Sequence, residues 1–226
     1  MVAIASFPFI SGPEFESGCT QILIRYQAGG HLQSDWECVR LIQGHDEATA
    51  YLSITKKIEG IGRRPDSSIE EYDDSVEALE EIDEEALPLT TATSQGLTVE
   101  YNIVLSPTYQ VPVLYFRFRD AGCALPLAID TLYQYVIPEQ FKSQVESFGV
   151  IGGITMTEHP VTNLPVFFVH PCNTATALEA SFHEREITSE QYMQLWIGTV
   201  GWHVGLRVPI AIASDKTDHL DVEING

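Results

Sequence analysis

Residues 97–120, LTVEYNIVLSPTYQVPVLYFRFRD, hold two apolar runs on either side of Pro107. The first run predicts a strand that ends at this proline, because proline has no N–H for a sheet ladder. The second run, 111–120, alternates in its latter half. One side takes Leu114, Phe116 and Phe118, and the other takes Tyr115, Arg117 and Arg119. Two strands with so short a connection predict an antiparallel hairpin.

The preceding segments predict a helix and a second hairpin. Residues 13–28 place apolar side chains at helical spacing and end at Gly29-Gly30, as a helix C-terminus prefers. The runs 35–42 and 50–58 then predict strands joined by the polar QGHDEAT. In the first of these strands, strict alternation would place three side chains on one side: Trp36, Cys38 and Arg40.

The following segments add helices and one short strand. Residues 126–136 and 138–148 predict helices, and 166–169 predicts a strand. A Thr-x-x-Gln capping box at Thr188 predicts the start of a helix over 189–206. Three glycines in that helix would cost stability, so we expect close packing there. The order of helix, strands, helices, strand and late helix predicts an α+β fold.

The composition narrows the class of protein. The chain has 226 residues, of which 44% are hydrophobic, enough for the core of one domain. No apolar run reaches about 18 residues, which predicts no membrane span. The apolar start of the chain has no basic segment ahead of it, so no secretory signal is expected. The expected location is therefore the cytoplasm.

Charge is concentrated in one tract. The net charge of −20 argues against nucleic acid and against anionic membranes as partners. Residues 66–86 hold 11 acidic side chains and no lysine or arginine, which is typical of a solvated or disordered loop. We expect a single domain over 1–226 with a disordered acidic insertion at 60–95. The alternative role of the tract is an electrostatic docking arm for a basic partner.

Cysteine spacing predicts neither a disulfide framework nor a zinc site, and no metal or other cofactor is expected. The four cysteines are Cys19, Cys38, Cys123 and Cys172. Cys172 directly follows His170-Pro171 behind an apolar run. It is either a buried thiol at a strand end or an exposed nucleophile, which would need thiolate. Alternation along a strand puts His170 on the same face, and whether its imidazole reaches the sulfur stays open.

Three blocks of the chain resemble one family. They are SPTYQVPVLYFRFRD (106–120), EHPVTNLPVFFVHPCNT (158–174) and YMQLWIGTVGWHVGLRVPIAIA (192–213). In this order and spacing they are similar to the E2-like ubiquitin-like-conjugating enzymes of autophagy, over roughly residues 97–213. Asn173-Thr174 and TYQVPVLYF resemble the protein-conjugating branch more than its lipid-conjugating sister.

The resemblance implies an E2-core-like antiparallel sheet flanked by helices, with extra strands and an acidic loop insertion. It also implies that Cys172 accepts the C-terminal glycine of the ubiquitin-like autophagy-related protein 12. The donor would be the E1-like autophagy-related protein 7, and the acceptor a lysine of autophagy-related protein 5. The His-Pro-Asn tripeptide of conventional E2 enzymes is missing ahead of the cysteine. Asn173 or backbone N–H groups after Cys172 are therefore candidates for stabilising the oxyanion.

Two more side chains are expected near the sulfur. Tyr109 stands just before the strand 111–120, which we expect beside the strand 166–169. His170 lies two residues before Cys172. Their expected role is to orient the thioester and the incoming lysine, and their structural alternatives are a tyrosine at a hairpin and a histidine closing a strand.

Three other functions remain open at this point. The first is the sister E2 that conjugates a ubiquitin-like modifier to a lipid. The second is a Cys-His hydrolase, although the local signatures of papain-like and caspase-like peptidases are absent. The third is a non-catalytic acidic interaction module in which Cys172 is only structural.

Overall fold

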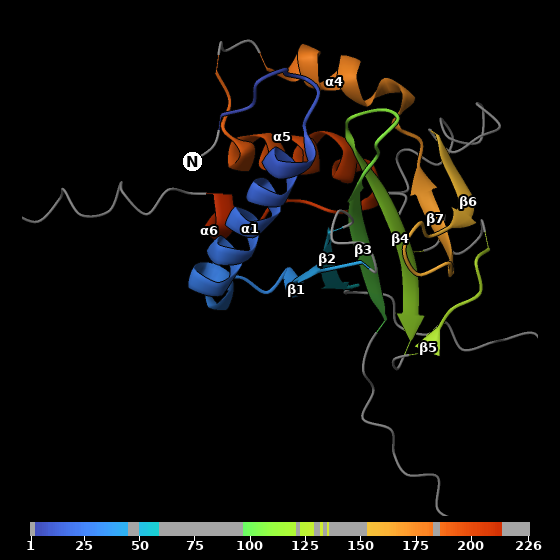
Figure 1. Ribbon diagram of the computed structural model, residues 1–226. Coiled ribbons are helices and arrows are strands. Elements are labelled where there is room, and N and C mark those ends of the chain that lie inside the picture. The colour runs from blue at the N-terminus through green and yellow to red at the C-terminus, as the bar shows by residue number, and fades with distance from the viewer. Residues whose placement is uncertain are drawn as a thin grey trace, which may run out of the picture.

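The computed structural model describes residues 3–44, 50–58, 97–120, 123–128, 132, 135, 153–182 and 186–213. Its centre is a seven-stranded antiparallel sheet in the order β1-β2-β3-β4-β7-β6, with β5 also paired to β4 (Figure 1). The strands are β1 (Trp36–Ile42), β2 (Tyr51–Lys57), β3 (Thr98–Leu105), β4 (Pro112–Asp120), β5 (Cys123–Ala124), β6 (Ile154–Glu158) and β7 (Pro165–Val169). The predicted α+β class and antiparallel sheet are confirmed.

The hairpin predicted over 97–120 forms the middle of the sheet. β3 and β4 pair along their whole length, from Thr98 opposite Arg119 to Leu105 opposite Pro112. The predicted alternation is confirmed, because Leu114, Phe116 and Phe118 are each no more than 1% exposed. β4 also pairs with β7, so the expected neighbour of the strand before Cys172 is correct.

Helices cover one face of this sheet, which we call the inner face (Figure 1). They are α1 (Gly12–Gly29), α4 (Thr174–Ser181), α5 (Ser189–Val200) and the short α6 (Ile210–Ala213), with 3-10 turns η1 (Gly30–Leu32), η2 (Pro171–Asn173) and η3 (Gly201–Val204). One hydrophobic core joins α1 and α5 to the inner face, and it includes Phe15, Ile22, Leu52, Ile54, Phe116 and Trp196. Tyr51, Asn102 and Tyr115 point to the opposite side, which we call the outer face.

The late helix is shorter than predicted. It starts at the expected capping box, where the Thr188 hydroxyl accepts from the Gln191 N–H and the Gln191 side chain accepts from the Thr188 N–H. It ends at Val200, and the prediction that it continues to residue 206 is wrong. A Cβ added at Gly201 would lie 2.7 Å from the Leu206 carbonyl oxygen, so the chain folds back tightly here. Gly205 takes the left-handed conformation, φ 75°, that ends the turn.

The predicted alternation in β1 is also wrong. A β-bulge between Trp36 and Cys38 shifts the register, so Trp36 pairs with Lys56 and Cys38 pairs with Thr55. Adjacent residues of β2 point to opposite faces, and Trp36 and Cys38 therefore do too. Trp36 is 2% exposed in the core, whereas Cys38 is only partly buried.

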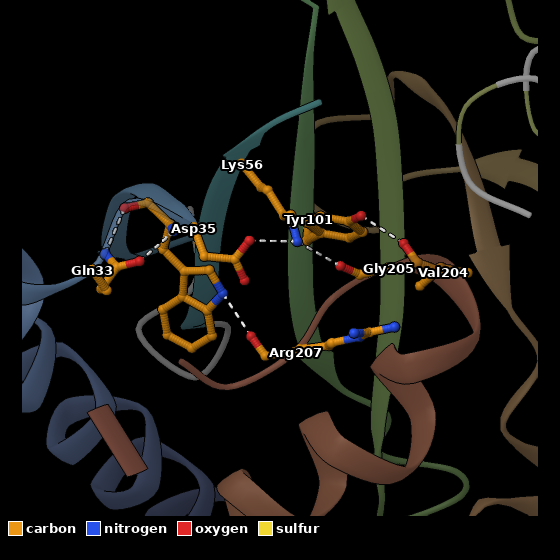
Figure 2. A network of polar contacts seen from close by, with 8 residues as sticks. Gln33, Asp35, Lys56, Tyr101, Val204, Gly205 and Arg207 are labelled. Atoms are coloured by element: carbon orange, nitrogen blue, oxygen red, sulfur yellow. Dashed lines mark hydrogen bonds and ion pairs between the residues drawn. The ribbon is translucent and has the colours of Figure 1, made fainter. Parts of the chain in front are cut away.

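Figure 2 shows how η3 is fixed to the sheet. The Tyr101 hydroxyl donates to the Val204 carbonyl at 2.6 Å. The Lys56 ammonium lies 2.7 Å from the Asp35 carboxylate and donates to the Gly205 carbonyl. The Trp36 indole donates to the Arg207 carbonyl at 2.9 Å. Three of these contacts pair carbonyls at the end of η3 and just after it with side chains of β1, β2 and β3.

The N-terminal arm, residues 3–11, is attached to the beginning of α5. Ala3 pairs with Thr188, and the Ile4 N–H donates to the Ile187 carbonyl at 2.9 Å. The Tyr192 hydroxyl donates to the Pro8 carbonyl. A buried carboxylate, Glu14, accepts from the N–H groups of Ala5 and Ser11 at 2.8 Å each. The arm therefore joins the beginning of the described chain to the beginning of α5.

Some predictions lie outside the described residues. They are the helix 138–148, the acidic insertion 60–95 and part of the helix 126–136. Of that last helix, Leu132 and Tyr135 are described and helical, but residues 126–128 are described and not helical, so the predicted start at residue 126 is wrong. The division into a single domain over 1–226 stays a prediction.

Candidate active site

Cys172 lies on the 3-10 turn η2, between the end of β7 and the start of α4. Its thiol is exposed. Pro171 is buried and begins the turn, where its fixed φ suits the first position of a helix and its missing N–H is not needed. The chain thus leaves the sheet at this point and presents Cys172 to solvent on a short turn.

His170 fixes the backbone of this turn. Its ring Nδ1 accepts a hydrogen bond from the backbone N–H of Cys172 at 3.2 Å. Its backbone N–H donates to the Gly153 carbonyl at 2.8 Å. A ring nitrogen that accepts a hydrogen bond carries no proton, so the neutral imidazole carries its proton on Nε2. His170 therefore offers Nε2–H as a donor, and neither of its nitrogens has a free lone pair to deprotonate the thiol.

Tyr109 comes from the turn between β3 and β4 and reaches the same place. Its ring meets the His170 ring edge to face, with centroids 5.8 Å apart. The turn is held by the Gln110 N–H, which donates to the Ser106 carbonyl at 2.8 Å, and Gln110 has φ 53°. Tyr109 is 42% exposed, so its hydroxyl can contact a bound substrate.

Asn173 follows Cys172 directly and is the residue that precedes α4. Its side chain is exposed and makes no capping hydrogen bond to the helix. The first N–H groups of any helix point away from its body and carry partial positive charge. Cys172 and Asn173 therefore stand at the positive end of α4. The four predicted site residues Cys172, His170, Tyr109 and Asn173 are thus neighbours in the structure.

The other three cysteines have different surroundings. Cys19 is fully buried in α1, and burial raises its thiol pKa well above the usual range. Cys38 is partly buried in β1. Cys123 is exposed on β5, which pairs only with the last two residues of β4. Exposure is therefore shared by Cys123 and Cys172, and only Cys172 has the histidine, the tyrosine and the helix start beside it.

Other kinds of site receive little support from the described residues. A pocket of about 330 Å³ includes Lys56, Val99 and Gly205. The pairing register puts it at the opposite end of the sheet from Tyr109 and Cys172. Within the described ranges, no three His, Cys, Asp or Glu side chains are grouped to hold a metal ion. None of the helices in these ranges is long and apolar enough to cross a membrane.

Two rings on the same face of the sheet as Tyr115 were not singled out from the sequence. Phe168 lies 6.0 Å from the His170 ring, centroid to centroid, on β7. His159, in the turn between β6 and β7, is fully buried against Tyr51 and Tyr115. The available signal was its place in the block EHPVTNLPVFFVHPCNT, where a second His-Pro pair stands 11 residues before His170-Pro171. An isolated histidine in a turn carries no stronger signal.

Comparison with known proteins places this site in a family. Residues 14–211 match the family model described as "Autophagocytosis associated protein, active-site domain". The ubiquitin-like-conjugating enzyme ATG10 of Gibberella zeae is 32% identical over 238 residues, covering 94% of this chain and 99% of that enzyme. ATG10 of Homo sapiens is 34% identical, covering 55% and 56% of the two chains, and ATG10 of Arabidopsis thaliana is 33% identical, covering 64% and 65%.

A solved structure was also found, the solution structure of KmAtg10. It is 13% identical, covers 86% of this chain and 97% of its own, and has a TM-score of 0.42. The family assignment rests on the sequence matches, which span most of the chain. The chain belongs to the autophagocytosis-associated protein family, and within it to the E2-like ubiquitin-like-conjugating enzymes of autophagy represented by ATG10.

Proposed function

We propose that Cys172 is the residue that carries the modifier during conjugation. It accepts the C-terminal glycine of autophagy-related protein 12 from the E1-like autophagy-related protein 7, as a thioester. It then transfers that glycine to a lysine of autophagy-related protein 5. The observation that carries the proposal is an exposed thiol on a turn at the start of α4, with its backbone fixed by His170 and the Tyr109 ring alongside.

The chemistry needs little acid-base assistance from the protein. In the first step the Cys172 thiolate attacks the thioester carbonyl carbon on the E1, a new C–S bond forms, and the E1 thiolate leaves. In the second step the deprotonated lysine amine attacks the Cys172 thioester, an amide bond forms, and the Cys172 thiolate leaves. Acyl activation is conserved in the first step and consumed in the second.

Both steps pass through a tetrahedral oxyanion that needs hydrogen-bond donors. The candidates are the Nε2–H of His170, the Asn173 side-chain amide, the N–H groups that begin α4 and the Tyr109 hydroxyl. The Cys172 N–H is not among them, because His170 Nδ1 already accepts it. These donors come from β7, from α4 and from the β3–β4 turn, so the position of the strands sets how they converge.

One alternative loses support from this geometry. A Cys-His hydrolase would use an imidazole lone pair to take the thiol proton, and His170 offers none in this arrangement. The lipid-conjugating sister activity would use the same cysteine and differs in its acceptor. The non-catalytic interaction module would not need Cys172 at all. The acceptor and the requirement for Cys172 therefore separate the remaining functions.

A conjugation assay with purified components tests the proposal. The wild-type chain is incubated with the E1, ATP and autophagy-related protein 12, and samples are run with and without reducing agent. We expect one band that reducing agent removes, and formation of the conjugate when autophagy-related protein 5 is added. Cys172→Ala should abolish both products, and Cys172→Ser should trap an oxyester that survives reduction.

Cys123→Ala is the matched control, because Cys123 is the other cysteine exposed in the described part of the chain. It should charge and transfer like the wild type. Conjugation by Cys172→Ala at the wild-type rate would refute the assignment. Transfer to phosphatidylethanolamine vesicles, with no transfer to the protein acceptor, would instead identify the lipid-conjugating activity.

A further inference from the structure

Six rings contact one another in sequence across the outer face of the sheet, ending beside Cys172. We call them the ring row: Tyr51, His159, Tyr115, Phe168, His170 and Tyr109. Successive ring centroids are 5.1, 5.3, 6.0, 6.0 and 5.8 Å apart. These spacings lie in the range at which aromatic rings attract each other. The row starts on β2 in the buried interior and ends at two exposed rings of the active site.

His159 is the buried wedge of this row. It is 0% exposed and its ring lies between Tyr51 of β2 and Tyr115 of β4. Its Nδ1 accepts from the N–H groups of Val161 and Thr162 at 3.1 and 3.2 Å, which fixes the ring relative to the β6–β7 turn. The histidine thus attaches this turn to the outer face through two hydrogen bonds on one side and two ring contacts on the other.

The attachment matters because few backbone pairs join β7 to β4. Two register pairs join these strands, Tyr115 with Phe168 and Phe116 with Phe167. The rings of the first pair are stacked, 20° from parallel. By contrast, β3 and β4 share eight register pairs. On the inner face Phe167 stacks on Phe116, with ring centroids 5.5 Å apart. On the outer face, the position of β7 against β4 depends on the Tyr115–Phe168 pair, and His159 packs against Tyr115.

That position decides whether the site residues meet. Tyr109 belongs to the turn that leads into β4, and His170 belongs to the end of β7. Their ring contact needs β7 in its observed place beside β4, whereas the hydrogen bond from the Cys172 N–H to His170 forms within the turn itself. A displacement of about 1 Å at a reacting group can slow an enzymatic step by as much as 10²-fold.

We propose that His159 is a positioning residue for the conjugation reaction. Its ring holds β7 on β4, and the ring row thereby aligns His170 and Tyr109 beside the Cys172 thioester. The inference rests on the proposed function of Cys172, and it concerns a residue that touches neither the thiol nor the substrate.

Two substitutions separate the ring from the hydrogen bonds. His159→Asn keeps an oxygen that can accept from the turn N–H groups and removes the ring, whereas His159→Phe keeps a ring and removes the acceptor. Both should accept modifier from the E1 within about threefold of the wild-type rate, since a thiolate is already a competent nucleophile. In single-turnover discharge onto the acceptor, His159→Asn should be about 10- to 100-fold slower. His159→Phe should discharge within about threefold of the wild type.

An NMR measurement reports the geometry without any reaction. The ring protons of His170 should show a ring-current shift from Tyr109 in the wild type and in His159→Phe, and should lose it in His159→Asn. Phe168→Leu removes the ring between Tyr115 and His170 and should behave like His159→Asn. It provides a second variant if His159→Asn does not fold. Ile54→Val, in the core on the inner face, is the control for a general loss of stability and should discharge normally.

The outcomes are distinguishable. Wild-type discharge by His159→Asn and Phe168→Leu, with unchanged His170 signals, would overturn the positioning role. Equal slowing of His159→Asn and His159→Phe would also overturn it, because a ring at this position would then not be enough to align the site. Absence of a Cys172 thioester in the wild type would refute the proposed function. The ring-current shift of the His170 protons would still test whether His159 positions the His170 and Tyr109 rings.

Discussion

The imidazole of His170 reaches the active-site turn with one nitrogen already engaged by the Cys172 N–H at 3.2 Å. The remaining nitrogen, Nε2, can act only as a hydrogen-bond donor. The Tyr109 hydroxyl also acts as a donor when it faces an oxyanion. At the scale of single residues, these two donors should matter when charge develops on the thioester oxygen. They should matter less while the thiol is being charged.

His170→Ala and Tyr109→Phe should therefore separate the two steps. Loading from the E1 should stay near the wild-type rate, and discharge onto the acceptor lysine should slow. Loss of one aligned oxyanion donor costs about 2.7–4 kcal/mol, or roughly 10²–10³ in rate. Single-turnover discharge of pre-charged protein measures this step alone. Unchanged discharge in both variants would return the two side chains to structural roles.

The buried His159 should make the fold sensitive to acid. Burial lowers its pKa from 6.5 to about 4, with a further lowering by Arg117 that is partly opposed by Glu100. Tyr51 and Tyr115 also face the ring. The unfolded chain binds a proton near pH 6.5 and the folded chain does not until about pH 4. Stability is therefore complete above pH 6.5 and falls as the pH drops through that window, by up to roughly 3 kcal/mol.

Denaturant titrations at several pH values should show this loss relative to His159→Phe. The variant cannot bind the proton, so its unfolding free energy should lack this loss. Between pH 6.5 and 4 the wild type should therefore become less stable relative to the variant. A difference that does not change with pH would mean that His159 is protonated in the folded chain at the same pH as in the unfolded one.

Residue identity allowed the candidate site residues to be expected close together, but not their geometry. Cys172, His170 and Asn173 follow one another in sequence, and Tyr109 could be placed beside them because a strand pairing was expected. The direction of the hydrogen bond between His170 and Cys172 could not be predicted, since it depends on backbone angles at Pro171. His159 was missed because its ring neighbours, Tyr51 and Tyr115, come from two strands distant in the sequence.

At the scale of elements, the same substitution should have opposite effects on stability at two glycines, one within α5 and one directly after it. A Cβ at Gly198 would meet nothing within 4 Å, whereas a Cβ at Gly201 would lie 2.7 Å from the Leu206 carbonyl oxygen and 3.0 Å from the Leu206 Cβ. Gly198→Ala should stabilise the protein by about 1 kcal/mol through helix propensity. Gly201→Ala should destabilise it by about 1–3 kcal/mol, because the turn must move.

Thermal or chemical unfolding of the two variants measures both effects. Each variant serves as the control for the other, since both exchange glycine for alanine within four residues. Two changes of the same sign would contradict the tight return of the chain at Gly201.

Elements were predictable where one residue pattern dominates, and not where two segments meet. The β3–β4 hairpin and the start of α5 follow from alternation and from a capping box. The end of α5 depends on Leu206 folding back onto Gly201, a tertiary contact that no helical period reveals. The bulge between Trp36 and Cys38 likewise depends on the pairing of β1 with β2, and alternation alone gave the wrong faces.

For the whole molecule, the acidic insertion begins and ends at neighbouring points. The Lys57–Thr98 pair closes the β2–β3 ladder, and the Ile58 N–H donates to the Leu97 carbonyl at 2.9 Å. The cost of closing a loop rises only slowly with its length, so the sheet has little need of the residues in between.

Deletion of residues 66–86 should therefore leave E1-dependent charging of Cys172 within a few-fold of the full chain. Encounter with a basic partner should still change at low salt, where charges act over longer distances. Charging assays at two salt concentrations, with circular dichroism to check the fold, measure both effects. Complete loss of charging with an intact fold would show that the tract is a docking element.

The contacts of the N-terminal arm have a consequence for co-translational folding. Residues 3–11 are synthesised well before their partners Ile187, Thr188 and Tyr192. At about 5–20 residues per second, the arm waits roughly 10–40 s for these partners. Nascent chains stalled before residue 187 should therefore expose the arm to proteases even after the β3–β4 hairpin has emerged. A segment that leaves the exit tunnel before the sheet thus completes its contacts only after the sheet has been synthesised.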